Sequence, residues 1–139
     1  MAVLGVDWGR ARTGVAVSDE LGMFAHPLAL VETASPEELA RRLEEEARGR
    51  GARRVVLGLP KNMDGSEGDS AAAVRRLGER LAALGLEVTY WDERLTTWEA
   101  EKFLGRERGL SAKKRKEAKD QLAACLILQS FLDKGRASA

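Results

Sequence analysis

Cysteine and histidine are almost absent from this chain. Of its 139 residues, one is a cysteine and one is a histidine. A single cysteine excludes a disulfide within the chain and is typical of a reducing compartment, so we expect a cytoplasmic protein. A zinc site built from several His and Cys ligands is excluded by the same scarcity. The only histidine, His26, precedes Pro27 on an expected edge strand, which favours a structural role over a catalytic one.

Long hydrophobic runs are also missing. The longest, Leu122 to Leu128, is far shorter than the roughly 20 residues that a membrane-spanning helix needs. The start of the chain has no basic leader and places Asp7 where an export signal would be apolar. We therefore expect neither membrane insertion nor export. Cys125 lies within the apolar run, which favours a core thiol over a nucleophile.

Charge is abundant but unevenly distributed. Charged residues make up 32% of the chain and hydrophobic residues 44%, which is enough for a genuine core in one domain. The net charge is only +1, yet the segment from Lys102 to Lys119 holds eight basic residues against two glutamates. Such a cluster supplies the sequence-independent part of affinity for nucleic acid. The alternative is a solvated helix face with no ligand.

Apolar periodicity and turn residues predict alternating elements. The expected strands are residues 2–7, 14–18, 24–31, 54–59 and 86–91. The expected helices are residues 36–50, 69–84, 98–104 and 114–134. This order predicts an α/β fold with a mixed five-stranded sheet flanked by helices: three antiparallel strands in hairpin succession, then parallel strands. Pro27 favours an edge position for the third strand. We expect one domain over residues 1–134 and a disordered tail at 135–139.

Asp7 is the first candidate for chemistry. It ends an apolar strand and precedes Trp8-Gly9, where the backbone can turn and approach a ligand. A carboxylate at the end of a buried strand costs free energy unless something pairs with it. A divalent cation is a suitable partner, because Mg²⁺ prefers hard oxygen ligands. The alternative is structural: Asp7 caps the turn or pairs with Arg10 or Arg12.

Glu93 is the second candidate. It follows the strand 86–91, and chemistry in parallel α/β sheets gathers at the carboxyl ends of strands. Asp92 competes for the same role, and the pattern of so short a strand does not separate the two. The alternative is a pair of solvated surface acids beside Arg94.

Asp120 is the third candidate. It shares a helix face with Ala124, Ile127 and other apolar residues, so we expect it to point at the sheet rather than at water. The alternative is that it caps the apolar part of the helix or pairs with Lys116. Three converging carboxylates can hold two divalent ions, which activate a water and stabilise the leaving oxygen of a phosphodiester.

Four segments carry motifs that occur together and in this order. They are Gly5 to Asp19, Val56 to Gly68, Asp92 to Thr97, and Lys116 to Gln129. Each motif alone is modest, but the four cover nearly the whole chain at fitting distances. In these segments the sequence resembles the YqgF/RuvX family of pre-ribosomal-RNA nucleases, which are also described as Holliday junction resolvases.

This resemblance implies a ribonuclease H-like fold and a hydrolase that acts on ester bonds. It implies catalytic and metal-binding residues at Asp7, Glu93 and Asp120, dependence on Mg²⁺ or Mn²⁺, and processing of the 5′ end of pre-16S rRNA. Nearby basic residues are then expected to bind the nucleic acid: Arg10, Arg12, Arg94, Lys113, Lys114, Arg115 and Lys116.

Other functions stay open at this point. Resolution of four-way DNA junctions would need paired cuts and hence a homodimer, whereas RNA trimming is open to a monomer. A non-catalytic nucleic-acid binding factor would keep the basic segment without needing Asp120. A phosphotransferase is a further alternative, because Asp7-x-Gly9 with Thr13-Gly14 looks like the phosphate hairpin of sugar kinases. The chain lacks both a second such domain and a Walker loop.

Overall fold

The computed structural model describes residues 2–33, 35–93 and 112–137, with the backbone alone for 112–120, 136 and 137. The helix expected at 98–104 and the side chain of Arg94 lie outside the described residues. The same holds for the side chains of Asp120 and of the basic residues 113–116.

Five strands form one mixed sheet with the order β3-β2-β1-β4-β5. The strands are β1 (Val3–Asp7), β2 (Arg12–Ser18), β3 (Ala25–Glu32), β4 (Arg54–Leu59) and β5 (Glu87–Asp92). The first three form an antiparallel meander, and β4 runs parallel to both β1 and β5. Pro27 lies on the edge strand β3, where the missing amide hydrogen leaves no central hydrogen bond unmade. The predicted mixed sheet is therefore confirmed.

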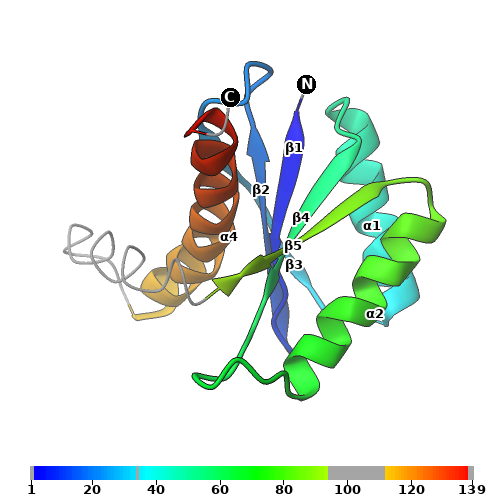
Figure 1. Cartoon of the computed structure of the whole chain (residues 1–139), viewed down its shortest axis with the longest axis vertical. Coiled ribbons are helices and arrows are strands. Elements are labelled where there is room, and N and C mark those ends of the chain that lie inside the picture. Colours follow the sequence, from blue (N-terminus) through cyan, green and yellow to red (C-terminus); the bar gives the residue numbers. More distant parts are fainter. Residues whose placement is uncertain (1, 34, 94–111, 138–139) are drawn as a thin grey trace.

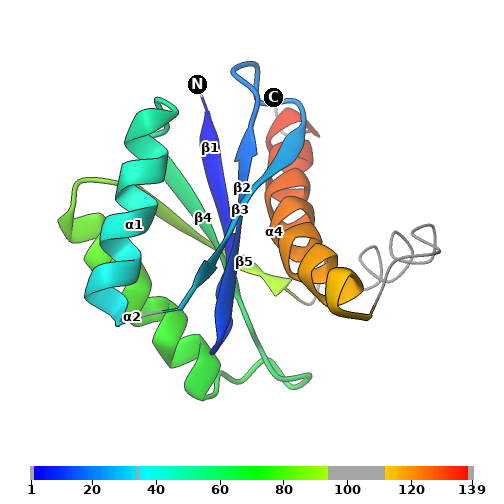
Figure 2. The ribbon, with the colours of Figure 1, turned by 180° about the vertical axis from the view of Figure 1, so that it is seen from behind.

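Helices cover both faces of the sheet (Figures 1 and 2). The helices α1 (Pro36–Gly49) and α2 (Asp69–Ala83) lie on one face, and α4 (Ala112–Ala137) lies on the other. Ser35 caps α1 as its sequence predicts, because its hydroxyl oxygen accepts a hydrogen bond from the amide of Glu38 at 3.2 Å. No described helix combines the length and apolarity that crossing a membrane requires.

Two hydrophobic clusters, one on each face, hold these layers together. Leu4 and Val6 of β1 belong to the cluster under α1 and α2, whereas Val56 of β4 belongs to the cluster under α4. Glycine lets α4 approach closely: a Cβ atom at Gly5 would lie 2.6 Å from the Cβ of Leu128. Because side chains alternate along a strand, Asp7 projects on the same side as Gly5, toward α4.

Candidate active site

Asp7 ends β1 half-buried, and a hydrogen-bonded network fixes the turn that follows it. A Cβ atom at Gly9 would lie 2.5 Å from the carbonyl oxygen of Arg12, so this turn requires glycine. The hydroxyl of Thr33 donates to the carbonyl oxygen of Gly9 at 2.6 Å. Thr33 also bonds the buried hydroxyl of Thr13 at 2.7 Å, and Thr13 must be the donor because Thr33 has only one hydroxyl hydrogen.

The Glu93 side chain meets Asp7 through a hydrogen bond between the two carboxyl groups. Their strands are not neighbours, since β4 lies between β1 and β5. Gly58 of β4 opens the path: a Cβ atom there would lie 2.6 Å from Oε1 of Glu93 and 2.5 Å from Cδ1 of Ile127. The glutamate therefore crosses β4 over a glycine, in the space between the sheet and α4.

Burial shapes the electrostatics of this acid pair. The pKa of Glu93 is raised, first by burial and also by the nearby charge of Asp92, while its hydrogen bond with Asp7 works in the opposite direction. Two carboxyl groups share a hydrogen bond only when one of them holds a proton. A cation between them can replace that proton, and oxygen donors suit a hard divalent ion. The pair therefore fits a metal of the kind that the sequence predicts.

The structure also decides which of Asp92 and Glu93 meets Asp7, a choice that the sequence pattern leaves open. Asp92 pairs with Leu59, whose side chain lies in the cluster under α1 and α2. Residues paired across parallel strands project on the same face, so Asp92 projects away from α4. Glu93 lies with Asp7 on the α4 face instead. Of the two acids, the geometry brings only Glu93 to Asp7.

Asp120 occupies a position on α4 close to this pair. Ala124, one helical turn later, packs on β1: its carbonyl oxygen would lie 3.1 Å from a Cβ atom at Gly5. The helix α4 runs opposite to β1 (Figure 1). Four residues of helix rise about 6 Å and two residues of strand about 6.6 Å, so the backbone of Asp120 reaches the level of Asp7. Its side chain lies outside the described residues.

The basic residues predicted to bind nucleic acid are only partly described. Arg10 is exposed in the turn between β1 and β2, and Arg12 is half-buried at the start of β2. The backbone of residues 113–116 forms the first turns of α4. Among the described side chains, which do not include Asp120, no three His, Cys, Asp or Glu residues are grouped to hold a metal.

Sequence reasoning missed Gly58 and Thr33. Gly58 stands in one of the family motifs, and this motif was the available signal.

This architecture is α/β and ribonuclease H-like. The structure of RuvC from Thermus thermophilus in complex with a Holliday junction substrate matches it with a TM-score of 0.56 at 17% sequence identity. The match covers 97% of this chain and 96% of RuvC. At this level of identity the likeness concerns the fold alone.

The chain belongs to the RuvX family, described as Holliday junction resolvase, whose family model matches residues 1–134. A relative from Endomicrobium trichonymphae, named "Putative pre-16S rRNA nuclease", is 43% identical over 94% of each chain. A relative of the same name from Anaeromyxobacter sp. strain K is 46% identical over 96% of this chain and 98% of its own. The resemblance seen in the sequence motifs is thereby confirmed.

Proposed function

We propose that this chain is a metal-dependent nuclease that hydrolyses phosphodiester bonds in structured nucleic acid. Asp7, Glu93 and Asp120 are its catalytic residues and the ligands of Mg²⁺ or Mn²⁺. The observation that carries the proposal is the hydrogen bond between the carboxyl groups of Asp7 and Glu93 across β4. Bringing two half-buried acids together costs free energy, and cation binding is the use that this arrangement supports best.

Each residue has a distinct part in this mechanism. Asp7 and Glu93 direct carboxylate oxygens into one place. The backbone of Asp120 on α4 reaches the level of Asp7, and its carboxylate is the third ligand of this proposal. When bound, divalent ions supply an activated water and stabilise the leaving oxygen of the phosphodiester. Gly58 keeps the path of Glu93 open, and Thr33 holds the turn after Asp7. The basic residues that this proposal assigns to the phosphate backbone are Arg10, Arg12, Arg94, Lys113, Lys114, Arg115 and Lys116.

The physiological reaction that we propose is processing of the 5′ end of pre-16S rRNA. This assignment is supported by the names of relatives that align over nearly their whole length. The nuclease domain spans residues 1–134 and acts in the cytoplasm, where a single cysteine stays reduced.

Resolution of four-way DNA junctions is the second candidate. The family's own description and the likeness of the fold to RuvC favour it. Junction resolution requires cuts in two related strands, so it predicts a symmetric homodimer in solution. RNA trimming carries no such requirement, and light scattering of the protein with and without a junction therefore helps to separate the two reactions.

A parallel cleavage assay tests the proposal. The protein is incubated with pre-16S rRNA and with a four-way junction, in Mg²⁺, in Mn²⁺ and in chelator, alongside Asp7→Asn. We expect metal-dependent cleavage of one substrate and a loss of about 100-fold or more in Asp7→Asn. Asp133→Asn, which changes an exposed acid on α4, is the matched control and should cleave like the wild type. Full activity of Asp7→Asn, with its fold intact by circular dichroism, would defeat the assignment.

A further inference from the structure

An open hollow of about 320 Å³ lies at the same end of the sheet as the acid pair. One wall comes from the turn after β1, and the other runs from the end of β4 into the first turn of α2. In Figures 1 and 2 this turn and the start of α2 lie side by side below the sheet. The hollow is large enough for a phosphate with part of its sugar.

Two cations from separate segments line this hollow: Arg10 from the turn after β1 and Lys61 from the loop after β4. Neither forms an ion pair with any residue that the structure describes. Asp69 is the acid that shares the lining. The pKa of Glu67 is lowered first by Arg75, which holds this carboxylate with two hydrogen bonds of 2.7 Å, and to a smaller extent by the nearby charge of Lys61. The hollow therefore keeps a positive charge that is available to an anion.

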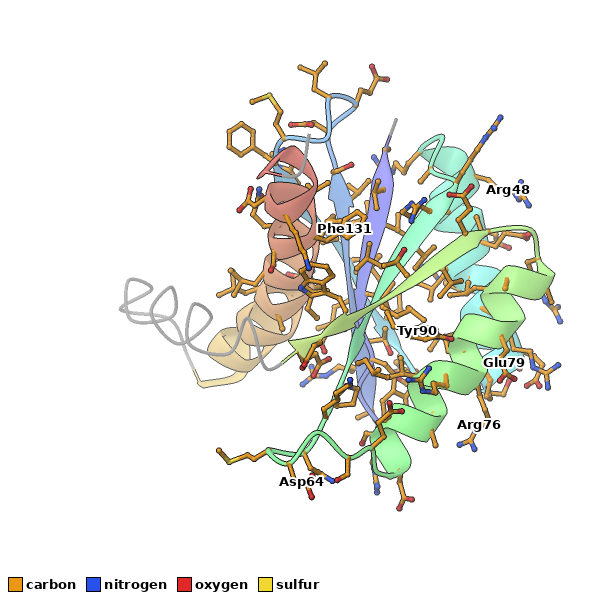
Figure 3. All side chains as sticks on the ribbon, viewed as in Figure 1. Arg48, Asp64, Arg76, Glu79, Tyr90 and Phe131 are labelled. Carbon is orange, nitrogen blue, oxygen red and sulfur yellow. The ribbon has the colours of Figure 1, made fainter. Side chains whose placement is uncertain are left out.

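Lys61 stands at the base of a hydrogen-bonded loop. The amide of Asn62 donates to the carbonyl oxygen of Ser66 at 2.8 Å, and the amide of Gly65 donates back to Asn62 at 2.9 Å. Oδ1 of Asp64 accepts from the amide and the hydroxyl of Ser66 at 2.9 and 2.6 Å. Figure 3 shows Asp64 at the outer end of this loop. These bonds order the segment that presents Lys61, so binding an anion there costs little further conformational entropy.

We propose that Arg10 and Lys61 bind a backbone phosphate of the substrate strand, adjacent to the phosphodiester held at the acid pair. Arg10 follows Asp7 by three residues and Lys61 follows Gly58 by three, a reach of at most about 11 Å in each case. The acid pair lies on the α4 side of the sheet and the hollow on the α2 side. The substrate strand therefore crosses the sheet at the edge formed by the carboxyl ends of β1 and β4. This inference rests on the proposed function only for its statement that the cut lies at the acid pair.

Binding measurements test the hollow without depending on cleavage. Lys61→Gln and Arg10→Gln are compared with the wild type by fluorescence anisotropy, on single-stranded RNA and on a four-way DNA junction, at several salt concentrations. We expect each variant to lose about 5- to 20-fold in affinity and to lower the salt slope by about one. The matched control is Arg76→Gln on the outer face of α2, which points away from the sheet in Figure 3. Variants that bind and respond to salt as this control does would overturn the inference.

A substrate with one neutral methylphosphonate locates the contact. As this group is moved along the strand, Lys61→Gln should lose its effect at one position, because the charge that Lys61 binds is gone there. If the wild type cleaves, that position should lie within two phosphates of the cut. A site far from the cut, or an equal effect of Lys61→Gln at every position, contradicts the inference. If no substrate is cleaved, the proposed nuclease fails, whereas a single sensitive position still supports the hollow as a phosphate site. Comparing the RNA substrate with the DNA junction shows which of the two nucleic acids the hollow binds.

Discussion

The carboxyl groups of Asp7 and Glu93 are joined by a hydrogen bond although the strand β4 separates β1, which ends at Asp7, from β5, which ends just before Glu93. Neighbouring strands lie about 4.8 Å apart, so β1 and β5 are separated by nearly 10 Å. The long side chain of glutamate spans part of this distance, and the absence of a side chain at Gly58 leaves its path clear. The contact thus requires an acid at the end of β1, a glycine on β4 and a glutamate directly after β5.

Shortening the glutamate should break this contact. Glu93→Asp keeps the charge but removes one methylene, so its oxygens fall more than 1 Å short of their place beside Asp7. Misplacement by about 1 Å can cost on the order of 100-fold in rate, and we expect Glu93→Asp to lose nearly as much cleavage activity as Glu93→Gln. Single-turnover cleavage rates measure the loss. Asp92→Asn is the matched control and should keep most of the activity, because Asp92 projects toward the opposite face. If Asp92→Asn lost more cleavage activity than Glu93→Asp, the catalytic role would belong to Asp92 instead of Glu93.

Adding a methyl group at Gly58 should displace both Glu93 and α4. The new Cβ atom would lie 2.6 Å from Oε1 of Glu93 and 2.5 Å from Cδ1 of Ile127. We expect Gly58→Ala to lower the free energy of unfolding by about 1–3 kcal/mol, as overpacked sites do, and to reduce cleavage at least as strongly as Glu93→Asp. Urea unfolding and cleavage rates measure the two effects.

Gly49→Ala is the control for that experiment. Gly49 is the last residue of α1, and a Cβ atom there would meet nothing within 4 Å. Its φ angle is not positive, so alanine fits the backbone and should raise stability by up to about 1 kcal/mol. If Gly58→Ala proved as harmless as Gly49→Ala, the close passage of Glu93 over β4 would be wrong.

Removing the Thr33 hydroxyl should loosen the turn after Asp7. Thr33→Val leaves the carbonyl oxygen of Gly9 and the buried hydroxyl of Thr13 without their partner, at a cost of about 1–3 kcal/mol in the free energy of unfolding. Cleavage should fall as well, because Asp7 and Arg10 flank the loosened turn. Urea unfolding and cleavage rates are compared with Thr33→Ser, which keeps the hydroxyl and should resemble the wild type. Equal behaviour of the two variants would show that this network does not hold the turn.

The Cys125 thiol should stay protonated well above neutral pH. Burial raises its pKa from the ordinary 9.0 to about 11. The thiolate is the reactive form, so alkylation of the folded protein at pH 8 should be about 100-fold slower than in denaturant and should accelerate toward pH 11. Because the unfolded chain ionises first, the free energy of unfolding should fall as the pH rises from 9 to 11. Mass spectrometry after timed iodoacetamide treatment follows the reaction. Rapid alkylation at pH 8 without unfolding would show the thiol to be exposed.

Most of the fold was predictable because the strands and helices have clear periodicity and clear ends. The strand Arg54–Leu59 matches its predicted bounds, since it is a continuous apolar run that stops at Pro60. Helix α1 begins at Pro36 after the Ser35 cap, as predicted. The helix α4 extends to Ala137, three residues beyond its predicted end, because nothing in Gly135 to Ala137 forces a stop. Residues 138 and 139 lie outside the described residues, so their disorder stays a prediction.

The site was predictable only in part, because the contact between Asp7 and Glu93 joins residues that are far apart in the sequence. Asp7 could be singled out because it ends a buried strand. The pattern of β5 does not separate Asp92 from Glu93, because a short strand followed by a turn leaves the face of its last residues open. Gly58 sits in a buried apolar run, and nothing along that run reveals that a glutamate from the next strand passes over it. Thr33 bonds Gly9, and Lys61 lines the hollow with Arg10. Each pair is far apart in the sequence, and hydrophobic periodicity does not reveal such pairs.

Manganese binding shows whether Asp7 and Glu93 hold a cation together, and its measurement does not require the right substrate. Mn²⁺ is titrated into the wild type, Asp7→Asn, Glu93→Gln and the surface control Glu79→Gln, with free Mn²⁺ followed by electron paramagnetic resonance. We predict that the wild type and Glu79→Gln bind Mn²⁺ alike, and that Asp7→Asn and Glu93→Gln each lose at least about 10-fold in affinity. Unchanged affinity in both site variants, with their folds intact, would contradict the account.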